Sequence, residues 1–533
     1  RLQCDGYLDL LAISGTYDDK PETMANSSRI FYGAPEGFSP DRCDILPTYC
    51  SGNAHLADIT RNGYLDILVG DKRGYVLIYL GGPEGYSLDR TRQIPMWTDC
   101  QGGASAAADL NGVARGKRVA ARFVDKLVDE GTKFPFSVMN LDIWGEDIED
   151  SPLVFEAGDP DGLLLPTERG FLPMPWLDAP TALLPLWMFH PDGRPYDGDP
   201  RQALARVVDR YKAAGLVPVV ATELEFFLID DSGRTLRVPP SPRSGKRRTG
   251  GEVLSLRALD AFDQFFTTLY DACESMDIPV DTSISEAGPG QFEINLMHQA
   301  DPLKAADDTW LFKMLVKGVA RSYGFAASFM AKPYDAWPGN GMHMHFSVLA
   351  KDGRNIFDNG GDEGTEALRH AVAGCLRAMP GSTLLFAPHE NSYDRLVPNA
   401  HAPTGIGWSY ENRTAAIRIP SSGPKARRIE HRVAGGDVNP YLTVAAILGA
   451  ALNGIEDRLQ APAPFKGNAY DQQLAQLPVD WGEAIDAFDT CPEIRRIFPE
   501  HLIDNYLRTK RQELHYMAEL SDEETVELYL DTV

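Results

Sequence analysis

The chain has 533 residues, of which 43% are hydrophobic and 24% charged, and its formal net charge is −25. This length predicts two or more domains, because one hydrophobic core rarely serves so many residues. The composition is globular, and the acidic balance argues against a nucleic-acid-binding surface. Seven cysteines without a CxxC pair exclude a disulfide framework or a zinc site, and no apolar run is long enough for a membrane span.

The first hundred residues contain a repeat. "YGAPEGFSPDR" (residues 32–42) returns as "LGGPEGYSLDR" (residues 80–90), and "NAHLADITRNGYLDILVG" (residues 53–70) echoes the start of the chain. Strand-like runs alternate with Gly and Pro turns, a pattern typical of β-propellers. The units resemble FG-GAP/VCBS-type blades. Two units and a fragment, over residues 1–108, predict an all-β but incomplete propeller.

One loop of this repeat has the spacing of a calcium-binding motif. Asp58, Thr60, Asn62, Gly63 and Asp66 match D-x-[DN]-x-[DN]-G-x-x-D loosely. Such a loop offers oxygen ligands to calcium, whereas the alternative is a tight turn in which the carboxylates accept backbone hydrogen bonds. The turn is favoured because short motifs recur by chance. A calcium-binding propeller, with the remainder of the chain inactive, is therefore one functional alternative.

From about residue 112 onward the pattern changes to alternating helices and strands. Helices are expected over residues 199–216, 255–277 and 439–459 and in the polar tail 493–533. Strands are expected over residues 218–230, 341–350, 414–420 and 426–434, with a hairpin over 281–298. The first helix begins with an Asp cap followed by Pro, a typical start signal. The mixture predicts an α+β architecture, an antiparallel sheet with peripheral helices.

Ionisable residues recur at a spacing of two within these strands, which places them on one face of each strand. The positions are Glu223 and Glu225, His343 and His345, Arg428, Glu430 and Arg432, and, across a Gly/Pro turn, Glu286 and Glu293. Each pair alone is typical of a solvated strand face. Together, five glutamates and a histidine on one sheet would repel one another unless cations lay among them. Such ligands suit two Mg²⁺ or Mn²⁺ ions, which with arginines serve phosphoryl transfer.

Residues 110–533 resemble the glutamine synthetase family along their whole length. The matching stretches are "LNGVARGKRV", "ELEFFLID", "EAGPGQFEI", "GNGMHMHFS", "NSYDRLVP", "NRTAAIRIP", "PKARRIEHR" and "NPYLTVAAILGA". The resemblance implies a β-grasp-type domain over residues 109–195, with its first elements missing, and a catalytic funnel over residues 196–533. It also implies a cytoplasmic, ATP-dependent ligase that joins glutamate to an amine through a γ-glutamyl phosphate.

The resemblance assigns roles to particular residues. One metal is expected on Glu225, Glu286 and Glu293, and the second on Glu223, His343 and Glu430. Substrate glutamate is expected on Arg395, Arg432 and the backbone near Gly339. The ATP phosphates are expected on the catalytic Arg413 and on His345, Arg418, Lys425 and Arg428.

Two further catalytic positions bear on the amine and on assembly. Glutamine synthetases proper carry a glutamate that binds ammonium where this chain has His401, which favours a larger amine, such as a polyamine, and keeps ammonia as the alternative. Asp142 lies where family members donate an aspartate to the neighbouring subunit, which implies a ring homo-oligomer. The alternative for Asp142 is the cap of a turn.

The segment "DLNG" (residues 109–112) fits both the repeat and the synthetase pattern, and no polar linker separates the two. Our hypothesis is that residues 1–108 derive from an unrelated secreted repeat protein, joined by recombination or by sequence assembly. The basic run over residues 241–251 lacks aromatic residues, so a loop near the catalytic mouth is favoured over a nucleic-acid site.

Overall fold

The computed structural model describes residues 9–12, 27–32, 34–35, 38–47, 54–58, 60, 63–71, 75–83, 85–87, 90–95, 102–233, 236–421 and 423–533. Backbone contacts divide the chain into two compact units. Unit 1 comprises Arg1–Gly103, Val119–Arg122 and Asp178–Ala182, and unit 2 comprises Ala104–Arg118, Phe123–Leu177 and Leu183–Val533. The domain bounds expected from the sequence, 1–108, 109–195 and 196–533, stay predictions.

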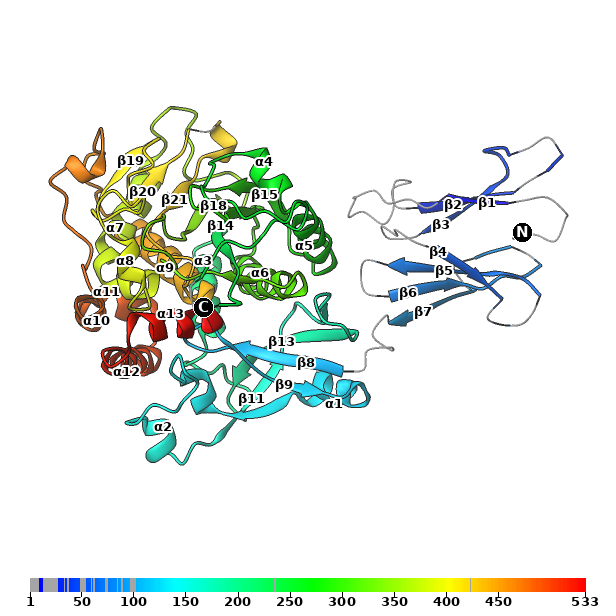
Figure 1. Ribbon diagram of the computed structural model, residues 1–533, viewed down its shortest axis with the longest axis horizontal. Helices are drawn as coiled ribbons and strands as arrows, with labels where there is room; N and C mark the ends of the chain where they lie inside the picture. The colour runs from blue at the N-terminus through cyan, green and yellow to red at the C-terminus, as the bar shows by residue number, and fades with distance from the viewer. Residues whose placement is uncertain are drawn as a thin grey trace. The chain divides into compact units, whose positions relative to one another are not determined.

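Unit 1 contains two small antiparallel sheets, drawn in blue in Figure 1. The first has β1 (Leu10–Ala12), β2 (Ser27–Phe31) and β3 (Cys43–Pro47), and the second has β4 (Ala54–Ala57), β5 (Asp66–Asp71), β6 (Tyr75–Tyr79) and β7 (Thr91–Pro95). In each repeat, a backbone hydrogen bond that we call the closing bond joins the first residue to the last. The Tyr32 N–H donates to the Arg42 carbonyl, and the Leu80 N–H donates to the Arg90 carbonyl, each at 3.0 Å. The sequence repeat is therefore also a structural repeat.

The candidate calcium loop is a hydrogen-bonded turn. Asp58 accepts from the Gly63 N–H at 2.9 Å, and the buried Asp66 accepts from the N–H groups of Gly81 at 2.8 Å and Thr60 at 3.1 Å. Asn62 lies outside the described residues. Within the described part of the chain, groups of three or more potential metal ligands occur in unit 2 alone. These hydrogen bonds are those that the turn alternative predicts.

Unit 2 begins with a six-stranded sheet of order β10-β11-β13-β8-β9, with β12 paired to β13. Its elements are β8 (Gly102–Ala108), β9 (Ala114–Val119), α1 (Val124–Glu130), β10 (Thr132–Pro135), α2 (Pro152–Phe155), β11 (Asp161–Pro166), β12 (Leu172–Pro173) and β13 (Thr181–Phe189). Strand β8, which ends at the boundary expected at residue 108, lies between β13 and β9 in this sheet.

The "DLNG" segment forms the turn between β8 and β9. Gly112 has a φ of 80°, a left-handed conformation that glycine adopts without strain. The fully buried Asp109 accepts from the N–H groups of Asn111 and Val113, each at 2.9 Å. Asn439 and Trp310 donate to the carbonyl groups of Asp109 and Gly112, each at 2.9 Å. The segment is therefore held inside unit 2.

An eight-stranded sheet forms the centre of unit 2, in the order β15-β16-β14-β18-β21-β20-β19, with β17 paired to β14. Its strands are β14 (Leu216–Ile229), β15 (Val280–Ser285), β16 (Gln291–Leu296), β17 (Ala326–Ser328), β18 (Met342–Ala350), β19 (Trp408–Tyr410), β20 (Ile417–Ile419) and β21 (Ile429–His431). The predicted strands and the hairpin are confirmed. The sheet is not wholly antiparallel, because β19 and β20 run parallel.

Helices surround this sheet, as Figure 1 shows in green to red. They are α3 (Pro200–Ala213), α4 (Leu256–Asp260), α5 (Asp263–Ser275), α6 (Pro302–Ser322), α7 (Glu366–Phe386), α8 (Ser392–Arg395), α9 (Pro440–Asp457), α10 (Trp481–Thr490), α11 (Pro492–Ile497), α12 (Glu500–Met517) and α13 (Asp522–Thr532). The α+β prediction is confirmed. The single helix expected over residues 255–277 is two helices, α4 and α5.

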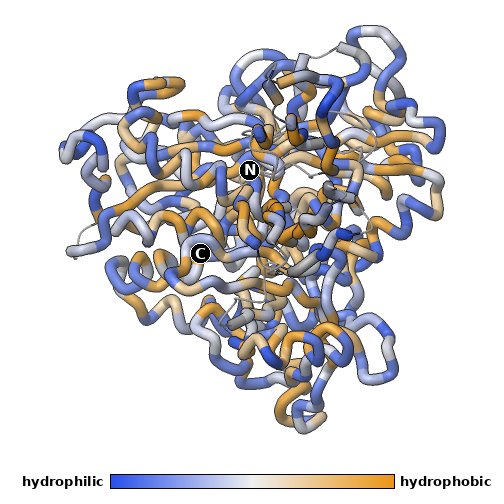
Figure 2. The backbone as a smooth tube through the Cα atoms, turned by 90° about the vertical axis from the view of Figure 1, so that its right-hand side faces the viewer, coloured by the Kyte–Doolittle hydropathy of each residue, from blue (hydrophilic) through white to orange (hydrophobic). Residues whose placement is uncertain are grey.

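Burial follows the hydropathy of the sequence. Figure 2 shows hydrophobic residues recurring along the helices and strands, whereas projecting loops are mostly hydrophilic. Helix α9 is buried along most of its length, and one large core joins the sheet to the helices around it.

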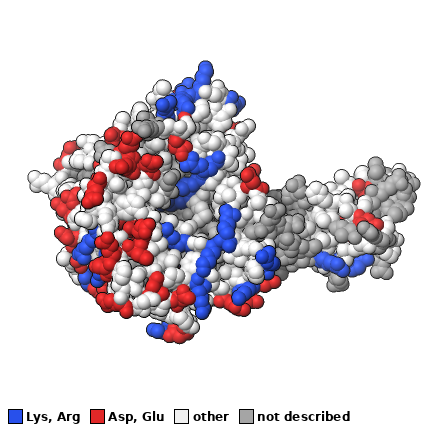
Figure 3. Space-filling view, turned by 60° about the horizontal axis from the view of Figure 1, so that its bottom comes forward, with Lys and Arg blue, Asp and Glu red and all other residues white. Residues whose placement is uncertain are grey.

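Acidic side chains cover much of the face in Figure 3, and lysines and arginines gather in narrow bands. Among the described residues, no helix combines the length and apolar character that crossing a membrane requires.

Candidate active site

Strand register brings the ionisable pairs of the sequence together. In the β14–β16 pair Glu225 lies opposite Glu293, and in the β14–β18 pair Glu223 lies opposite His343. In the β18–β21 pair, His345 lies opposite Glu430. Because opposite residues point to the same face of a sheet, these side chains form one row across four strands.

The first cluster consists of Glu225, Glu286 and Glu293, whose carboxylate oxygens lie within 4.8 Å of one another. Burial, together with the neighbouring charge of Glu225, raises the pKa of Glu286 to about 7. Burial and the same carboxylate also raise the pKa of Glu293. The Gly341 N–H donates to Glu225 at 2.7 Å. These are the three residues expected on one metal, and without a cation two of them bind a proton more tightly than a free glutamate does.

The second cluster is centred on Glu223. Its two oxygens lie 3.2 Å from Nδ1 of His343 and 2.8 Å from Nε2 of His345. Burial acts to raise the pKa of Glu223, but the two histidines hold it below its ordinary value. Glu223, His345 and Glu430 form one potential metal group, and Glu223, Glu293 and His343 form another. His345, which was expected to face ATP, thus shares the ligand set of Glu223.

Arginines border the second cluster, of which Arg432 is buried and Arg418 and Arg428 are partly buried. Arg418 donates to Glu430 at 2.7 Å, and Arg432 donates to the other oxygen of the same carboxylate. Burial opposes ionisation of Glu430, but Arg432 and the nearby cations lower its pKa. Arg428 donates from Nε to Nδ1 of His345 at 2.9 Å. This end of the row carries the positive charge that anionic oxygens require.

Arg395 lies beside the first cluster. It is 4% exposed and donates to the Val433 carbonyl at 2.8 Å. A Cβ atom at Gly339 would lie 3.0 Å from its Cγ, and one at Gly341 would lie 2.9 Å from its Nη2. Both glycines therefore leave room for this arginine, and the residues expected to bind glutamate share one wall of the site.

Four predicted residues lie apart from these clusters. Arg413, Lys425 and His401 are exposed, although the charge of Arg413 acts on Glu286. Asp142 is 2% exposed and accepts from the N–H groups of Trp144 and Glu146 and from Gln512. This arrangement is that of the turn-capping alternative, so the role of Asp142 at a neighbouring subunit stays a prediction.

Sequence reasoning missed two residues of the site. The Gly341 N–H donates a hydrogen bond to Glu225. Its position directly before the "MHMH" strand could have indicated that it lies at the site. The His298 ring lies 6.2 Å from the His345 ring, and burial and the charge of His345 lower its pKa. His298 follows the end of β16, so no strand periodicity pointed to it.

The donor set fits divalent cations that prefer oxygen. Five of its seven members are carboxylates and two are imidazoles. Burial and the neighbouring charge of Glu225 raise the pKa of Glu286 and of Glu293, and a bound cation would relieve this repulsion. Arginines next to such a set neutralise phosphate oxygens. An acidic row with these arginines, on a sheet wrapped by helices, defines the class of metal-dependent enzymes that act on phosphate groups.

Known proteins agree with this class. Residues 197–529 match the family model of the glutamine synthetase catalytic domain. γ-Glutamylputrescine synthetase PuuA of Escherichia coli is 36% identical over 425 residues, covering 79% of this chain and 90% of that relative. γ-Glutamylethanolamide synthetase GlnA4 of Streptomyces coelicolor is 31% identical, covering 77% and 88%. A solved glutamine synthase homologue is 26% identical with a TM-score of 0.71, covering 81% and 99%. The chain belongs to the glutamine synthetase family.

Proposed function

We propose that the protein is an ATP-dependent ligase that forms a γ-glutamyl amide from glutamate and an organic amine. The observation that carries this proposal is the row of Glu223, Glu225, Glu286, Glu293, His343 and Glu430, with Arg418 and Arg432 paired to Glu430. Relatives named as γ-glutamylputrescine and γ-glutamylethanolamide synthetases support an amine as the acceptor.

The chemistry requires an activated carboxylate, because a free carboxylate does not react with amines. We assign one metal to Glu225, Glu286 and Glu293, and the second to Glu223, His343 and Glu430. His345, whose ligand atom lies within 4.8 Å of those of Glu223 and Glu430, is a further candidate ligand of the second metal. Mg²⁺ or Mn²⁺ bound there would neutralise the phosphate oxygens of ATP. Arg413, Arg418 and Arg428 add positive charge where phosphate charge develops, and Arg395 and Arg432 with the Gly339 backbone hold the substrate glutamate.

ATP transfers its γ-phosphate to the γ-carboxylate of glutamate, which releases ADP and forms γ-glutamyl phosphate. The amine then attacks the acyl carbon, the bond from this carbon to the phosphate oxygen breaks, and phosphate leaves while the amine loses a proton. Water must be kept out at this stage, since it would hydrolyse the activated acyl group. His401 supports a larger amine because an uncharged or cationic imidazole does not attract ammonium as a carboxylate does. Ammonia is the second candidate, which the family name itself supports.

Phosphate release by the full chain with glutamate, ATP and Mg²⁺ tests the proposal, with ammonium, putrescine, spermidine, ethanolamine and simple monoamines compared as acceptors. We expect an organic amine to exceed ammonium by more than about tenfold in kcat/KM, a difference of about 1.4 kcal/mol in transition-state binding. A higher kcat/KM with ammonium would identify a glutamine synthetase instead. No release with any acceptor would contradict both.

Three finer assignments complete the proposal. The repeats of unit 1 are of the FG-GAP/VCBS type, which the recurring closing bond supports. The enzyme assembles into a ring and acts in the cytoplasm. Calcium binding by unit 1 is the weaker alternative, because the carboxylates of Asp58 and Asp66 already accept backbone hydrogen bonds.

A further inference from the structure

The turn that carries Arg395 is short and depends on its neighbours. Helix α8 has four residues, too few to be stable by itself. Arg395 ends this turn, and the close approach of Gly339 and Gly341 leaves its side chain little freedom. A shift of the α8 backbone would therefore move the guanidinium directly.

Two anchors hold the turn from within the catalytic domain. Ser392 donates to the buried Asp437 and accepts from the His389 N–H at 3.0 Å. The Asn391 amide exchanges two bonds with the Lys332 backbone, at 2.9 and 3.0 Å. These contacts position the start of the turn on one side.

The C-terminal helix supplies a third anchor from the other side. Tyr529 of α13 is 1% exposed, and its hydroxyl accepts from the Glu390 N–H at 3.3 Å. Its ring lies 5.1 Å from the ring of His389. Tyr529 thus contacts the two residues that lead into Asn391 and α8, although it lies 134 positions beyond Arg395 in the sequence.

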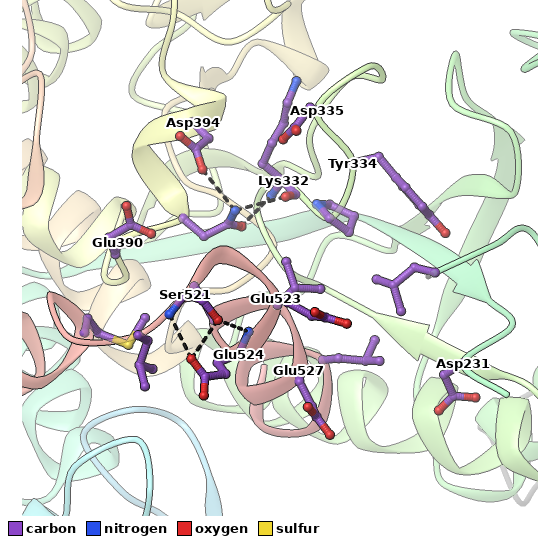
Figure 4. A pocket seen from close by; sticks show the side chains of 18 of the residues that line it. Asp231, Lys332, Tyr334, Asp335, Glu390, Asp394, Ser521, Glu523, Glu524 and Glu527 are labelled. Carbon is purple, nitrogen blue, oxygen red and sulfur yellow. Dashed lines mark hydrogen bonds between the residues drawn. The ribbon is translucent and has the colours of Figure 1, made fainter. Parts of the chain in front are cut away.

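Elsewhere the helix and the turn are separated by a cleft of about 1720 Å³. Figure 4 shows Glu523 and Glu527 on the α13 wall and Lys332, Asp335 and Asp394 on the opposite wall. The contacts of Tyr529 with Glu390 and His389 lie where the helix meets the segment before α8.

We propose that Tyr529 is a positioning residue, which sets the placement of Arg395, and hence the affinity for substrate glutamate, through His389 and Glu390. This inference rests on the proposed function, in which Arg395 binds a glutamate carboxylate. It adds the C-terminal helix to the elements that determine substrate affinity. Tyr529 touches no substrate, so it acts on binding and not on the chemical step.

Steady-state kinetics of Tyr529→Phe in the full chain test the proposal. The change removes one hydroxyl and keeps the ring on His389. We expect the KM for glutamate to rise about threefold to tenfold, the effect of one buried hydrogen bond, with kcat and the KM for ATP within about twofold of the original protein. Tyr529→Leu, which also removes the ring, should raise the KM further.

Thr532→Val is the matched control, because it removes a hydroxyl from the same helix that donates to the Leu528 carbonyl at 2.8 Å. It should leave all three constants unchanged. An unaltered glutamate KM in Tyr529→Phe, or an equal rise in Thr532→Val, would overturn the positioning role. Arg395→Lys separates the two hypotheses: if it raises the glutamate KM while Tyr529→Phe does not, only this inference fails. If Arg395→Lys leaves that KM unchanged, the proposed role of Arg395 fails as well.

Discussion

At the scale of single residues, His401 is the position that bears most directly on the choice of amine. Asn399 and His401 have φ values of 66° and 62°, so the loop is held in a conformation that few side chains adopt readily. Ala402 follows His401, and the Tyr470 hydroxyl donates to its carbonyl at 2.7 Å. Burial raises the pKa of Tyr470, and the nearby charges of Arg395 and Arg432 oppose this rise. The loop therefore adjoins the proposed glutamate site.

We predict that His401→Glu shifts the preference toward ammonium. A carboxylate at this position attracts a small cation, so the ratio of kcat/KM for ammonium to that for the best organic amine should rise about tenfold or more. Competition assays of the two acceptors measure this ratio. His401→Asn is the control, since asparagine tolerates the left-handed backbone and carries no charge. An equal shift in both variants would show that loss of the imidazole, and not the carboxylate, is responsible.

A second prediction concerns the pH dependence of stability of the metal-free protein. Glu286 has a pKa of about 7 in the folded chain and about 4.5 when unfolded, so the folded state binds its proton more tightly. The resulting stability is present below pH 4.5 and is lost as the pH rises through 7, a change of about 3 kcal/mol. Unfolding by urea in EDTA, from pH 5 to pH 8, should show this loss.

Two variants of that experiment identify its cause. Glu286→Gln should reduce the slope without abolishing it, because the amide does not titrate whereas Glu293, whose pKa is also raised, still does. Saturating Mg²⁺ should flatten the pH dependence, since a bound cation favours the ionised carboxylates. A slope that is undiminished under both conditions would contradict the assignment to this cluster.

At the scale of elements, the helix signals of the sequence were reliable where a cap marked the start. Asp199 caps α3, accepting from the N–H groups of Arg201 and Gln202 at 2.7 and 3.0 Å, as the Asp-Pro pair predicted. Its second oxygen also accepts from the Met188 N–H at 2.7 Å, a contact with β13 that no local pattern reveals. The same carboxylate therefore starts a helix and joins it to a strand.

We predict that Asp199→Ala lowers the free energy of unfolding by about 2 kcal/mol. The change removes the cap and leaves the buried Met188 N–H without its acceptor. Urea unfolding at pH 8 measures the loss. Asp192→Ala, in the exposed turn just before, should change stability by less than about 0.5 kcal/mol. Similar values for both variants would exclude this role of the cap.

At the scale of the whole molecule, the contacts of "DLNG" assign this segment to the catalytic unit. Asn111 donates to Glu513 at 2.7 Å and accepts from Lys510 at 2.6 Å, and all three side chains are buried. Lys510 also pairs with Glu513 at 2.8 Å. These bonds join residues about 400 positions apart, so the segment is structurally part of the synthetase although the repeat pattern also fits it.

We predict that Lys510→Met destabilises the protein by about 3 to 5 kcal/mol, because it leaves the Glu513 carboxylate buried without its charge partner. The double change Lys510→Met and Glu513→Leu should recover most of this loss, since no uncompensated charge then remains. Thermal unfolding of both variants measures the difference. Lys126→Met, from an exposed pair with Glu130, is the control and should have little effect. A double variant no more stable than the single one would contradict the ion-pair explanation.

The sequence by itself determined the residue types of the site and the face of each strand on which they lie. Alternation along a strand is local, so Glu223 with Glu225 and His343 with His345 could be paired without coordinates. Helix caps and the family motifs are equally local, which is why the α+β class and the family were predicted correctly.

Only the tertiary structure decided which strands are neighbours and which side chains their register brings together. It grouped His345 with Glu223 and Glu430, turned the carboxylate of Asp142 toward backbone N–H groups, and brought Tyr529 to the turn of Arg395. Such contacts join residues far apart in the chain. They depend on how the hydrophobic faces of the whole sheet and its helices pack, and no local period encodes that packing.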